Sequence, residues 1–120
     1  EINGGIRAIA EIQSHLQQVD AVMIGRVAYE NPYFLATVDR DIYGEKIEPL
    51  TRAEIVRKML PYIDEWTRKG LKLHAVSRHL LTLFNGQPGT KAWKRHISEN
   101  AHLLNADSQI IKKALQKVSF

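Results

Sequence analysis

Apolar residues recur at helical spacing along most of this chain, and short apolar runs interrupt that pattern near its start. A helix over residues 6–19 is predicted from the recurrence of Ile6, Ile9, Ile12, Leu16 and Val19. Residues 1–2 indicate the end of one strand, and the run 21–24 is typical of a parallel strand buried on both faces. Residues 27–43 favour a helix in two pieces, because Pro32 suits a first helical turn. The N-terminal stretch is therefore predicted as β-α-β-α.

A linker at residues 44–50 contains glycine, proline and charged residues, and the pattern after it is helical. Thr51 and Glu54 have the spacing of a capping box that opens the next helix. Pro61 is expected to kink this helix, because it removes one backbone donor. The apolar face of the helix is expected to consist of Ile55, Met59, Tyr62, Ile63 and Trp66.

Three further helices are predicted. One spans residues 72–85, and its inward apolar face is expected to consist of Leu73, Val76, Leu80, Leu83 and Phe84. The next is expected to be capped by Thr90 and to point inward with Trp93, Ile97 and Ala101. Asp107 is expected to cap the last. Four short helices joined by short loops indicate an antiparallel four-helix bundle.

Two short parallel strands cannot bury both of their faces alone, so the first part of the chain requires further strands and helices. We therefore interpret residues 1–45 as the last β-α-β-α of a larger α/β domain, and favour a TIM (β/α)₈ barrel. Residues 46–120 are predicted to form an all-α domain, which makes the chain mostly α. Glu1 in place of methionine agrees with a piece of a longer protein.

Net charge differs between the two parts of the chain. The shares of hydrophobic and charged residues, 44% and 25%, are those of a globular protein. Residues 1–50 contain four basic and eight acidic residues, a net charge of −4, whereas residues 51–120 contain thirteen basic and five acidic residues, a net charge of +8. A basic domain favours a polyanionic partner, although a solvated lysine-rich surface has the same composition.

The residue types exclude several kinds of site. The chain contains no cysteine, and therefore no disulfide, thiolate metal site or cysteine nucleophile. No metal site is expected from His74 and His79, which diverge on a helix, or from the more distant His96 and His102. No paired carboxylates suit acid–base work, so no catalytic residue is assigned. No apolar run approaches the roughly 20 residues that span a bilayer, and a soluble, cytoplasmic protein is expected.

Two glycine-bearing turns, Asn3-Gly4-Gly5 and Gly25-Arg26, follow the predicted strands. Because neighbouring parallel strands end at the same edge of a sheet, we expect the two turns to lie together. Glycine lets a ligand approach the backbone, amides at a helix start favour an anion, and Arg26 would add a permanently charged clamp. The turns are therefore predicted to hold a phosphate, with ordinary tight connections as the alternative.

A second group of polar and basic residues lies on the predicted helices. His74 and Arg78 project from the side of their helix opposite its apolar positions. Lys91, Lys94 and Arg95 share one face of the following helix. Packed side by side, the two helices would present a positive strip to phosphates. Exposed lysine and arginine are also common on helices that bind nothing.

Several motifs together resemble flavin-dependent tRNA-dihydrouridine synthases, in particular the A-type branch of the bacterial enzymes. In the first part these are Asn3-Gly4-Gly5-Ile6, Val22-Met23-Ile24-Gly25-Arg26 and Tyr29-x-Asn31-Pro32-Tyr33. In the helical part they are Met59-Leu60-Pro61-Tyr62-Ile63, Ser77-Arg78-His79-Leu80-Leu81-x-Leu83-Phe84-x-Gly86-x-Pro88-Gly89 and Trp93-x-Arg95-x-x-Ser98-Glu99-Asn100-Ala101. The similarity covers nearly the whole chain.

The resemblance implies an FMN-binding barrel followed by a helical tRNA-binding domain. Such enzymes reduce uridines of the tRNA D-loop to dihydrouridine, with NADPH supplying hydride to FMN. By resemblance, the FMN phosphate would be held by Asn3, Gly4, Gly5, Gly25 and Arg26. The resemblance also implies that Arg78 contacts the tRNA, with Ala75 nearby. The helix pattern adds His74, Lys91, Lys94 and Arg95 as further candidates for that contact.

The resemblance also implies that this chain is one part of a monomeric parent enzyme. The catalytic cysteine of the family, and the lysine and histidine that contact its flavin, would precede residue 1, so the chain alone is expected to be inactive. Two alternatives stay open at this point. The helical part is a non-catalytic RNA-binding module, or the barrel serves another phosphorylated ligand such as a sugar phosphate.

Overall fold

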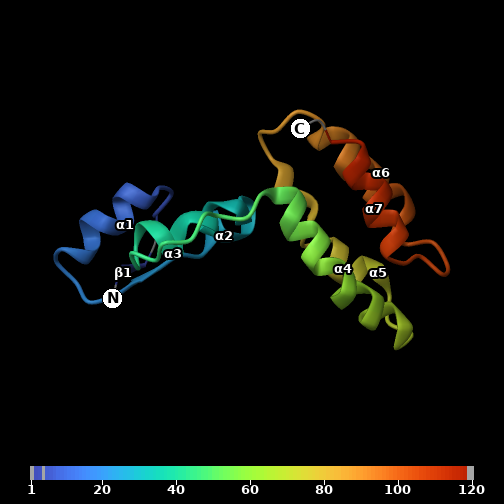
Figure 1. Ribbon diagram of the computed structural model, residues 1–120, viewed down its shortest axis with the longest axis horizontal. Helices are drawn as coiled ribbons and strands as arrows, with labels where there is room; N and C mark the ends of the chain where they lie inside the picture. Colours follow the sequence, from blue (N-terminus) through green and yellow to red (C-terminus); the bar gives the residue numbers. More distant parts are fainter. Residues whose placement is uncertain (1, 4, 119–120) are drawn as a thin grey trace. The chain divides into compact units, whose positions relative to one another are not determined.

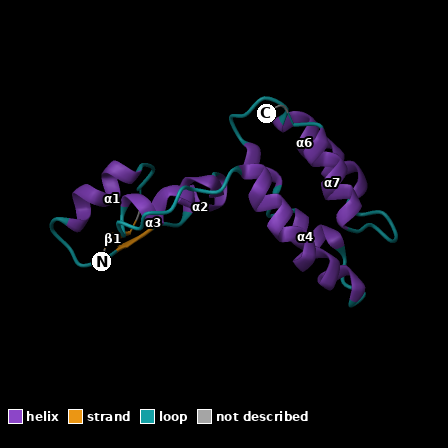
Figure 2. Cartoon of the chain, viewed as in Figure 1, coloured by secondary structure: helices purple, strands orange, loops and turns teal. Residues whose placement is uncertain are grey.

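The computed structural model describes residues 2–3 and 5–118, and the chain divides into two compact units, Glu1–Leu50 and Thr51–Phe120. Figure 1 colours the first unit from blue to blue-green and the second from green to red. Helices dominate the described residues, and the strands of this part of the chain occur in the first unit (Figure 2). The prediction of a mostly helical chain is confirmed.

The first unit contains a two-stranded parallel sheet. Strands β1 (Ile2–Asn3) and β2 (Val22–Met23) pair with Ile2 opposite Val22 and Asn3 opposite Met23. The predicted parallel pairing is therefore confirmed. The helical segments of this unit are α1 (Ile9–Leu16), α2 (Arg26–Glu30), the 3₁₀ helix η1 (Pro32–Thr37) and α3 (Val38–Asp41). Pro32 stands in the first turn of η1, where the sequence pattern places it.

Two predictions for this unit are wrong in extent. Helix α1 occupies Ile9–Leu16 rather than residues 6–19, and β2 has two residues rather than four. Val22 is half-buried and Met23 is 41% exposed, so β2 is not covered on both faces by the described residues. The physical reason is that β2 has one neighbouring strand among them, and such a sheet needs more elements to cover it. The core of the unit consists of Ile6, Ile12 and Val27.

The second unit is all helical. Its segments are α4 (Arg52–Arg68), α5 (Leu73–Ser77), the 3₁₀ helix η2 (Leu81–Phe84), α6 (Thr90–Asn100) and α7 (Ser108–Gln116). Helix α7 packs against both α6 and α4, whereas α6 also contacts η2 and α4 contacts α5. Figure 1 shows α6 and α7 running side by side. Pro61 lies inside α4, which continues through it to Arg68.

The single helix predicted over residues 72–85 is wrong, and with it the count of four helices. After Ser77 the chain tightens into bonds that span three residues, from His79 N to the Val76 oxygen (3.1 Å) and from Leu80 N to the Ser77 oxygen (2.9 Å). These bonds join residues three apart, as in a 3₁₀ helix, instead of four apart as in an α-helix. Helix α5 therefore ends here, and the chain continues into η2. The antiparallel four-helix bundle is replaced by three longer helices and two short ones among the described residues.

The core of the second unit lies around Trp93, which has no exposed surface. The Trp93 Nε1 donates a hydrogen bond to the main-chain oxygen of Leu80 at 3.1 Å. The ring of Phe84 meets the indole edge-on, with 4.6 Å between ring centroids. The buried face predicted for α6, which consists of Trp93, Ile97 and Ala101, is confirmed.

The buried face of α4 is rotated from the predicted one. Val56 and Ile63 are fully buried, whereas Tyr62 is 53% exposed. Trp66 is half-buried, and its Nε1 donates to the main-chain oxygen of Lys72 at 2.8 Å. Tyr62 stacks on Trp66 at 6.3 Å between centroids. These aromatic rings lie at the edge of the core, where a polar tip reaches a partner.

Two of the three predicted helix caps are confirmed. Thr51 Oγ1 accepts from Glu54 N at 3.1 Å and Glu54 Oε1 accepts from Thr51 N at 3.2 Å, which completes a capping box. Asp107 Oδ1 accepts from Gln109 N at 2.9 Å. The cap assigned to Thr90 is wrong, because Gly89 takes the N-cap position with φ +89° and Thr90 is the first helical residue.

Removal of the α4 cap is expected to destabilise the helical unit. Thr51→Ala deletes one half of the capping box and should lower the free energy of unfolding by about 1 kcal/mol, measured by urea denaturation followed by circular dichroism. The hydrogen bonds from Thr51 hold the pKa of the Glu54 carboxyl below its usual value. This contribution is present above the unfolded pKa of Glu54 and is lost as pH falls through the folded one, so the variant should show a smaller acid dependence.

Glu54→Gln is the matched control for this experiment. The amide keeps an acceptor for Thr51 N but cannot titrate, so this variant should lose the acid dependence while retaining part of the cap. A Thr51→Ala variant as stable as the native chain at neutral pH would contradict the prediction.

Candidate functional site

Gly5 from the first predicted turn, and Gly25 and Arg26 from the second, line one pocket of about 390 Å³ in the first unit. Gly5, Ile6 and Arg7 approach it from the end of β1, and residues 23–27 approach it from the end of β2. The parallel pairing brings these two ends together. Gly5, Gly25 and Arg26 therefore lie around the same pocket, and their role in binding a phosphate stays a prediction.

Two members of the predicted set stand differently. Asn3 is the last residue of β1, and it pairs with Met23, which lines the pocket. Gly4 lies outside the described residues. Arg26 is the first residue of α2, and Gly25 holds its N-cap position.

Arg7 is a pocket residue that sequence reasoning missed. Its guanidinium lies 3.7 Å from Glu30, and both side chains are exposed. Each glycine turn is followed within two residues by an arginine, and that symmetry was the available signal. Arg26 has no ion pair with any residue that the structure describes.

A side chain at either pocket glycine would not collide with the rest of the protein, so lack of space does not explain these two glycines. Gly5 has φ +71°, and an added Cβ would meet nothing within 4 Å. At Gly25 the φ is −113°, and a Cβ would lie 3.9 Å from Met23 Sδ, an ordinary contact. The pocket thus has free space over its glycines, as a site in which a ligand approaches the backbone requires.

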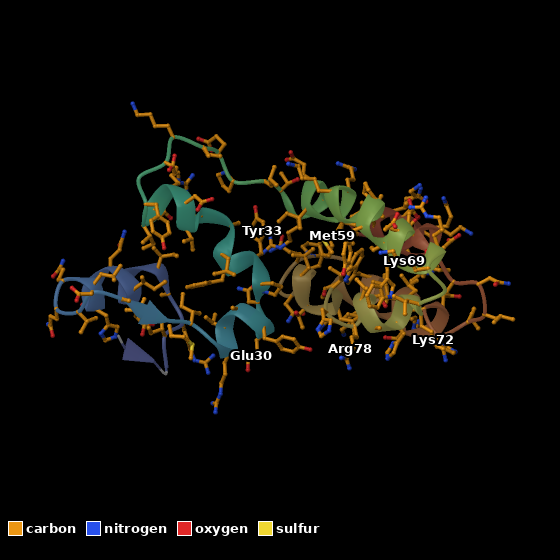
Figure 3. The ribbon with its side chains drawn as sticks, turned by 90° about the horizontal axis from the view of Figure 1, so that it is seen from below. Glu30, Tyr33, Met59, Lys69, Lys72 and Arg78 are labelled. Carbon is orange, nitrogen blue, oxygen red and sulfur yellow. The ribbon has the colours of Figure 1, made fainter. Side chains whose placement is uncertain are left out.

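The second predicted group is divided between two places in the helical unit. His74 and Ala75 are exposed on α5, and Arg78 is exposed at its C-cap, as labelled in Figure 3. Arg78 Nε donates to His79 Nε2 at 3.3 Å. Lys91 and Arg95 instead line a pocket of about 540 Å³ on α6, together with Ala92, His96, Glu99 and Lys117.

Lys94 does not join Lys91 and Arg95 in that pocket and is half-buried. Lys91 and Arg95 are exposed on α6, whereas Lys94, which follows the fully buried Trp93, is less accessible to a ligand. Lys117, at the C-cap of α7, takes the place beside Lys91 and Arg95. Its contribution was not visible in the sequence, since it depends on the packing of α7 against α6.

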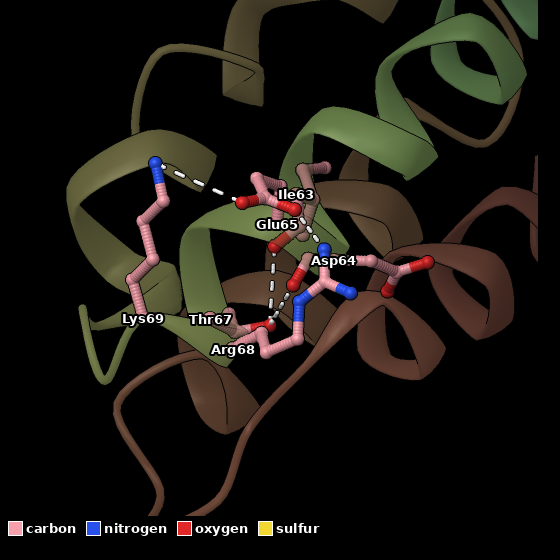
Figure 4. A network of polar contacts seen from close by, with 6 residues as sticks. All are labelled: Ile63, Asp64, Glu65, Thr67, Arg68 and Lys69. Atoms are coloured by element: carbon pink, nitrogen blue, oxygen red, sulfur yellow. Dashed lines mark hydrogen bonds and ion pairs between the residues drawn. The ribbon is translucent and has the colours of Figure 1, made fainter.

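Some of the basic residues are already paired with carboxylates. Figure 4 shows Glu65 contacting Arg68 and Lys69 at the end of α4, the latter at 3.7 Å. In the same network Thr67 Oγ1 donates to the main-chain oxygen of Ile63 at 3.1 Å. Arg68 and Lys69 are therefore partly neutralised, which makes them weaker candidates for an anion site than Arg78.

The imidazole of His96, in the helical pocket, has a lowered pKa. Burial lowers the pKa of the imidazole, Lys117 and Lys113 lower it further, and Glu99 raises it. Its Nε2 is buried and has no hydrogen-bond partner among the described residues. Burial and the two lysines thus favour the neutral imidazole over its protonated form.

Among residues 2–3 and 5–118, no three His, Cys, Asp or Glu side chains lie close enough to hold a metal ion. In the same part, no helix has the length and apolar character needed to cross a bilayer.

Comparison with known proteins identifies the family. The family model described as dihydrouridine synthase (Dus) matches residues 1–119. The chain belongs to the dihydrouridine synthase family. The resemblance stated from the motifs is therefore confirmed.

Three relatives of this dihydrouridine synthase chain are named tRNA-dihydrouridine(20/20a) synthase. The protein from Synechocystis sp. is 52% identical over 120 residues, which is 100% of this chain and 36% of that protein. The Vibrio cholerae protein is 43% identical over 119 residues, 99% of this chain and 36% of its own length. The Escherichia coli K12 protein is 45% identical over 118 residues, 98% and 34% respectively. The chain spans about a third of the length of these relatives.

Substitution of the pocket glycines should show whether each glycine is needed for its backbone conformation or only leaves room above the main chain. Gly5→Ala places a side chain on a residue with left-handed backbone and should lower the free energy of unfolding of the first unit by about 1 kcal/mol. That change corresponds to roughly fivefold faster amide exchange in β2. Gly25→Ala is the matched control and should change exchange little, because its φ is negative and its Cβ has room. Equal effects of the two substitutions, measured by hydrogen exchange with NMR detection, would contradict this account.

Proposed function

We propose that this chain is the C-terminal part of an FMN-dependent tRNA-dihydrouridine synthase, which reduces D-loop uridines in the cytoplasm as a monomer, with NADPH as the hydride donor. The observation that carries the proposal is the pocket shared by Gly5, Gly25 and Arg26 at the ends of two parallel strands, in a member of this family. The first unit is then the last β-α-β-α of a TIM barrel, and the second is the tRNA-binding domain.

The pocket residues fit the phosphate of FMN. Space over Gly5 and Gly25 allows phosphate oxygens to approach the main chain. Arg26 provides a charge that persists at every relevant pH and can bind two oxygens at once. Arg7 lines the same pocket and provides a second cation for the phosphate. Asn3 and Gly4, predicted from the sequence, belong to the same proposed phosphate site. FMN supplies the hydride chemistry when bound, and these residues hold and orient its phosphate end.

The helical unit fits the role of gripping tRNA. Its net charge of +8 attracts a phosphate backbone, and Arg78 and His74 are exposed on one short helix. Ala75, exposed beside them, offers contact area but no hydrogen-bonding group. Lys91 and Arg95 provide a second basic place on α6, with Lys94 retained as a weaker member because it is half-buried.

The first test concerns the flavin phosphate. Arg26→Ala in the full-length protein should weaken FMN binding about 10- to 150-fold, because loss of a hydrogen bond to a charged group costs about 1.5–3 kcal/mol. The same variant should leave the binding of riboflavin, which has no phosphate, unchanged. Arg40→Ala is the control, since Arg40 is exposed in the same unit and pairs with Asp41 outside the pocket. A full-length protein that binds no flavin, measured by visible absorbance and flavin titration, would overturn the proposal and favour another phosphorylated ligand.

The second test concerns tRNA. Arg78→Ala should weaken binding of an unmodified tRNA transcript about 5- to 10-fold near 0.1 M salt and reduce the salt slope by about one. Lys46→Ala, in the linker of the acidic unit, is the control for loss of one positive charge. Fluorescence anisotropy across a salt series measures both quantities. Binding that is absent, or that does not change with salt, would speak against an RNA-binding role for the helical unit.

A further inference from the structure

The pocket on α6 collects positive charge from two helices. We call it the α6–α7 cleft and define it by Lys91, Ala92, Arg95, His96, Glu99 and Lys117. Lysine and arginine contribute three positive charges to it, and Glu99 contributes one negative charge. Lys113, on the last turn of α7, also acts on His96 electrostatically. The cleft thus has a net positive charge, with a fourth cation close by.

Two of these cations are not neutralised by a carboxylate. Glu99 lies 3.6 Å from Arg95 and pairs with it on the surface of α6. Lys91 and Lys117 have no ion pair with any residue in the described part of the chain. Unpaired cations that converge on one hollow repel each other, and an anion between them relieves that repulsion.

The size and lining of the cleft favour a nucleotide unit over a small ion. Its volume of about 540 Å³ is that of a site for an organic ligand, well above the need of one inorganic phosphate. The methyl group of Ala92 and the aliphatic stems of its lysines add apolar surface against which a sugar or base can lie. The +8 charge of the surrounding unit favours a polyanion as the source of that nucleotide.

We infer that the α6–α7 cleft is a binding site for a phosphodiester segment of RNA, held by Lys117 with Lys91 and Arg95, and that its occupation is coupled to protonation of His96. The inference rests on the proposed RNA-binding function and assigns it a second contact region, separate in sequence from Arg78. Lys117 and His96 are the residues that it adds.

The coupling follows from the charges that surround His96. Lys113 and Lys117 face the ring from α7, Glu99 and Arg95 lie on its own helix, and η2, which also packs on α6, has no charged residue. A bound phosphodiester offsets the field of the lysines, so the pKa of His96 rises on binding. The complex then takes up a proton, and RNA affinity increases as pH falls through the range between the free and bound pKa values.

The matched pair of variants is Lys117→Gln and Lys112→Gln. Both lysines are exposed, Lys117 at the C-cap of α7 and Lys112 in the middle of that helix, and Lys112 lines a different pocket with Arg57 and Leu60. With the full 120-residue chain and an unmodified tRNA transcript, Lys117→Gln should weaken binding about 5- to 10-fold near 0.1 M salt. Lys112→Gln should change it less than twofold. Glu99→Gln, which removes the carboxylate of the cleft, should strengthen binding.

Equal losses in the two lysine variants would overturn the inference, because they would show only a general charge effect. Such a result would leave the proposed function intact if Arg78→Ala still weakens binding. A native chain that binds no tRNA would refute the proposed function itself. Circular dichroism melting of each variant verifies that a loss of binding is not a loss of fold.

The titration of His96 gives an independent readout on the native chain. NMR of the imidazole, with and without a short single-stranded RNA, should show an upward shift of its pKa on binding. His15, on α1 of the acidic unit and outside every proposed site, is the internal control for that titration. A His96 pKa that RNA leaves unchanged would overturn the coupling, and an equal shift with inorganic phosphate alone would reduce the cleft to a general anion site.

Discussion

The indole of Trp93 is fully buried, and its Nε1 donates a hydrogen bond to the main-chain oxygen of Leu80. A buried indole N–H needs such a partner, so the turn that carries Leu80 is fixed against α6. Truncation of a buried tryptophan typically costs about 3–5 kcal/mol, a large part of the stability of a small domain. Arg78 lies just before that turn, and Lys91 and Arg95 lie on the turns of α6 around Trp93. One core contact therefore sets the spacing between the two basic places of the surface.

The sequence predicted the elements that depend on local chemistry. The capping box at Thr51 and the proline turn at Pro32 follow from short-range hydrogen bonding and a fixed φ, and both are present. The break after Ser77 could not be predicted, because residues 72–85 have an apolar repeat that suits either one helix or two. At this break the Leu80 carbonyl accepts a hydrogen bond from the buried Trp93, a tertiary contact that the local pattern of residues 72–85 does not contain.

Predictability of the candidate sites follows the same division. Gly5, Gly25 and Arg26 could be placed together because the ends of paired parallel strands coincide. Lys117 could not, since its place in the cleft depends on how α7 lies on α6. The assignment of the glycine turns to an FMN phosphate and of the helices to tRNA stays a prediction. Membership of the dihydrouridine synthase family supports it.

The unequal charges of the two units have a consequence for the rate and direction of encounter. The first unit has a net charge of −4 and the second of +8, so a polyanion is repelled by the first unit and attracted by the second before any contact forms. Unproductive collisions with the acidic unit are shortened, and diffusion is directed toward the basic one. The charges of the two units thereby influence how a polyanion approaches before contact, over the Debye length of about 10 Å at 0.1 M salt.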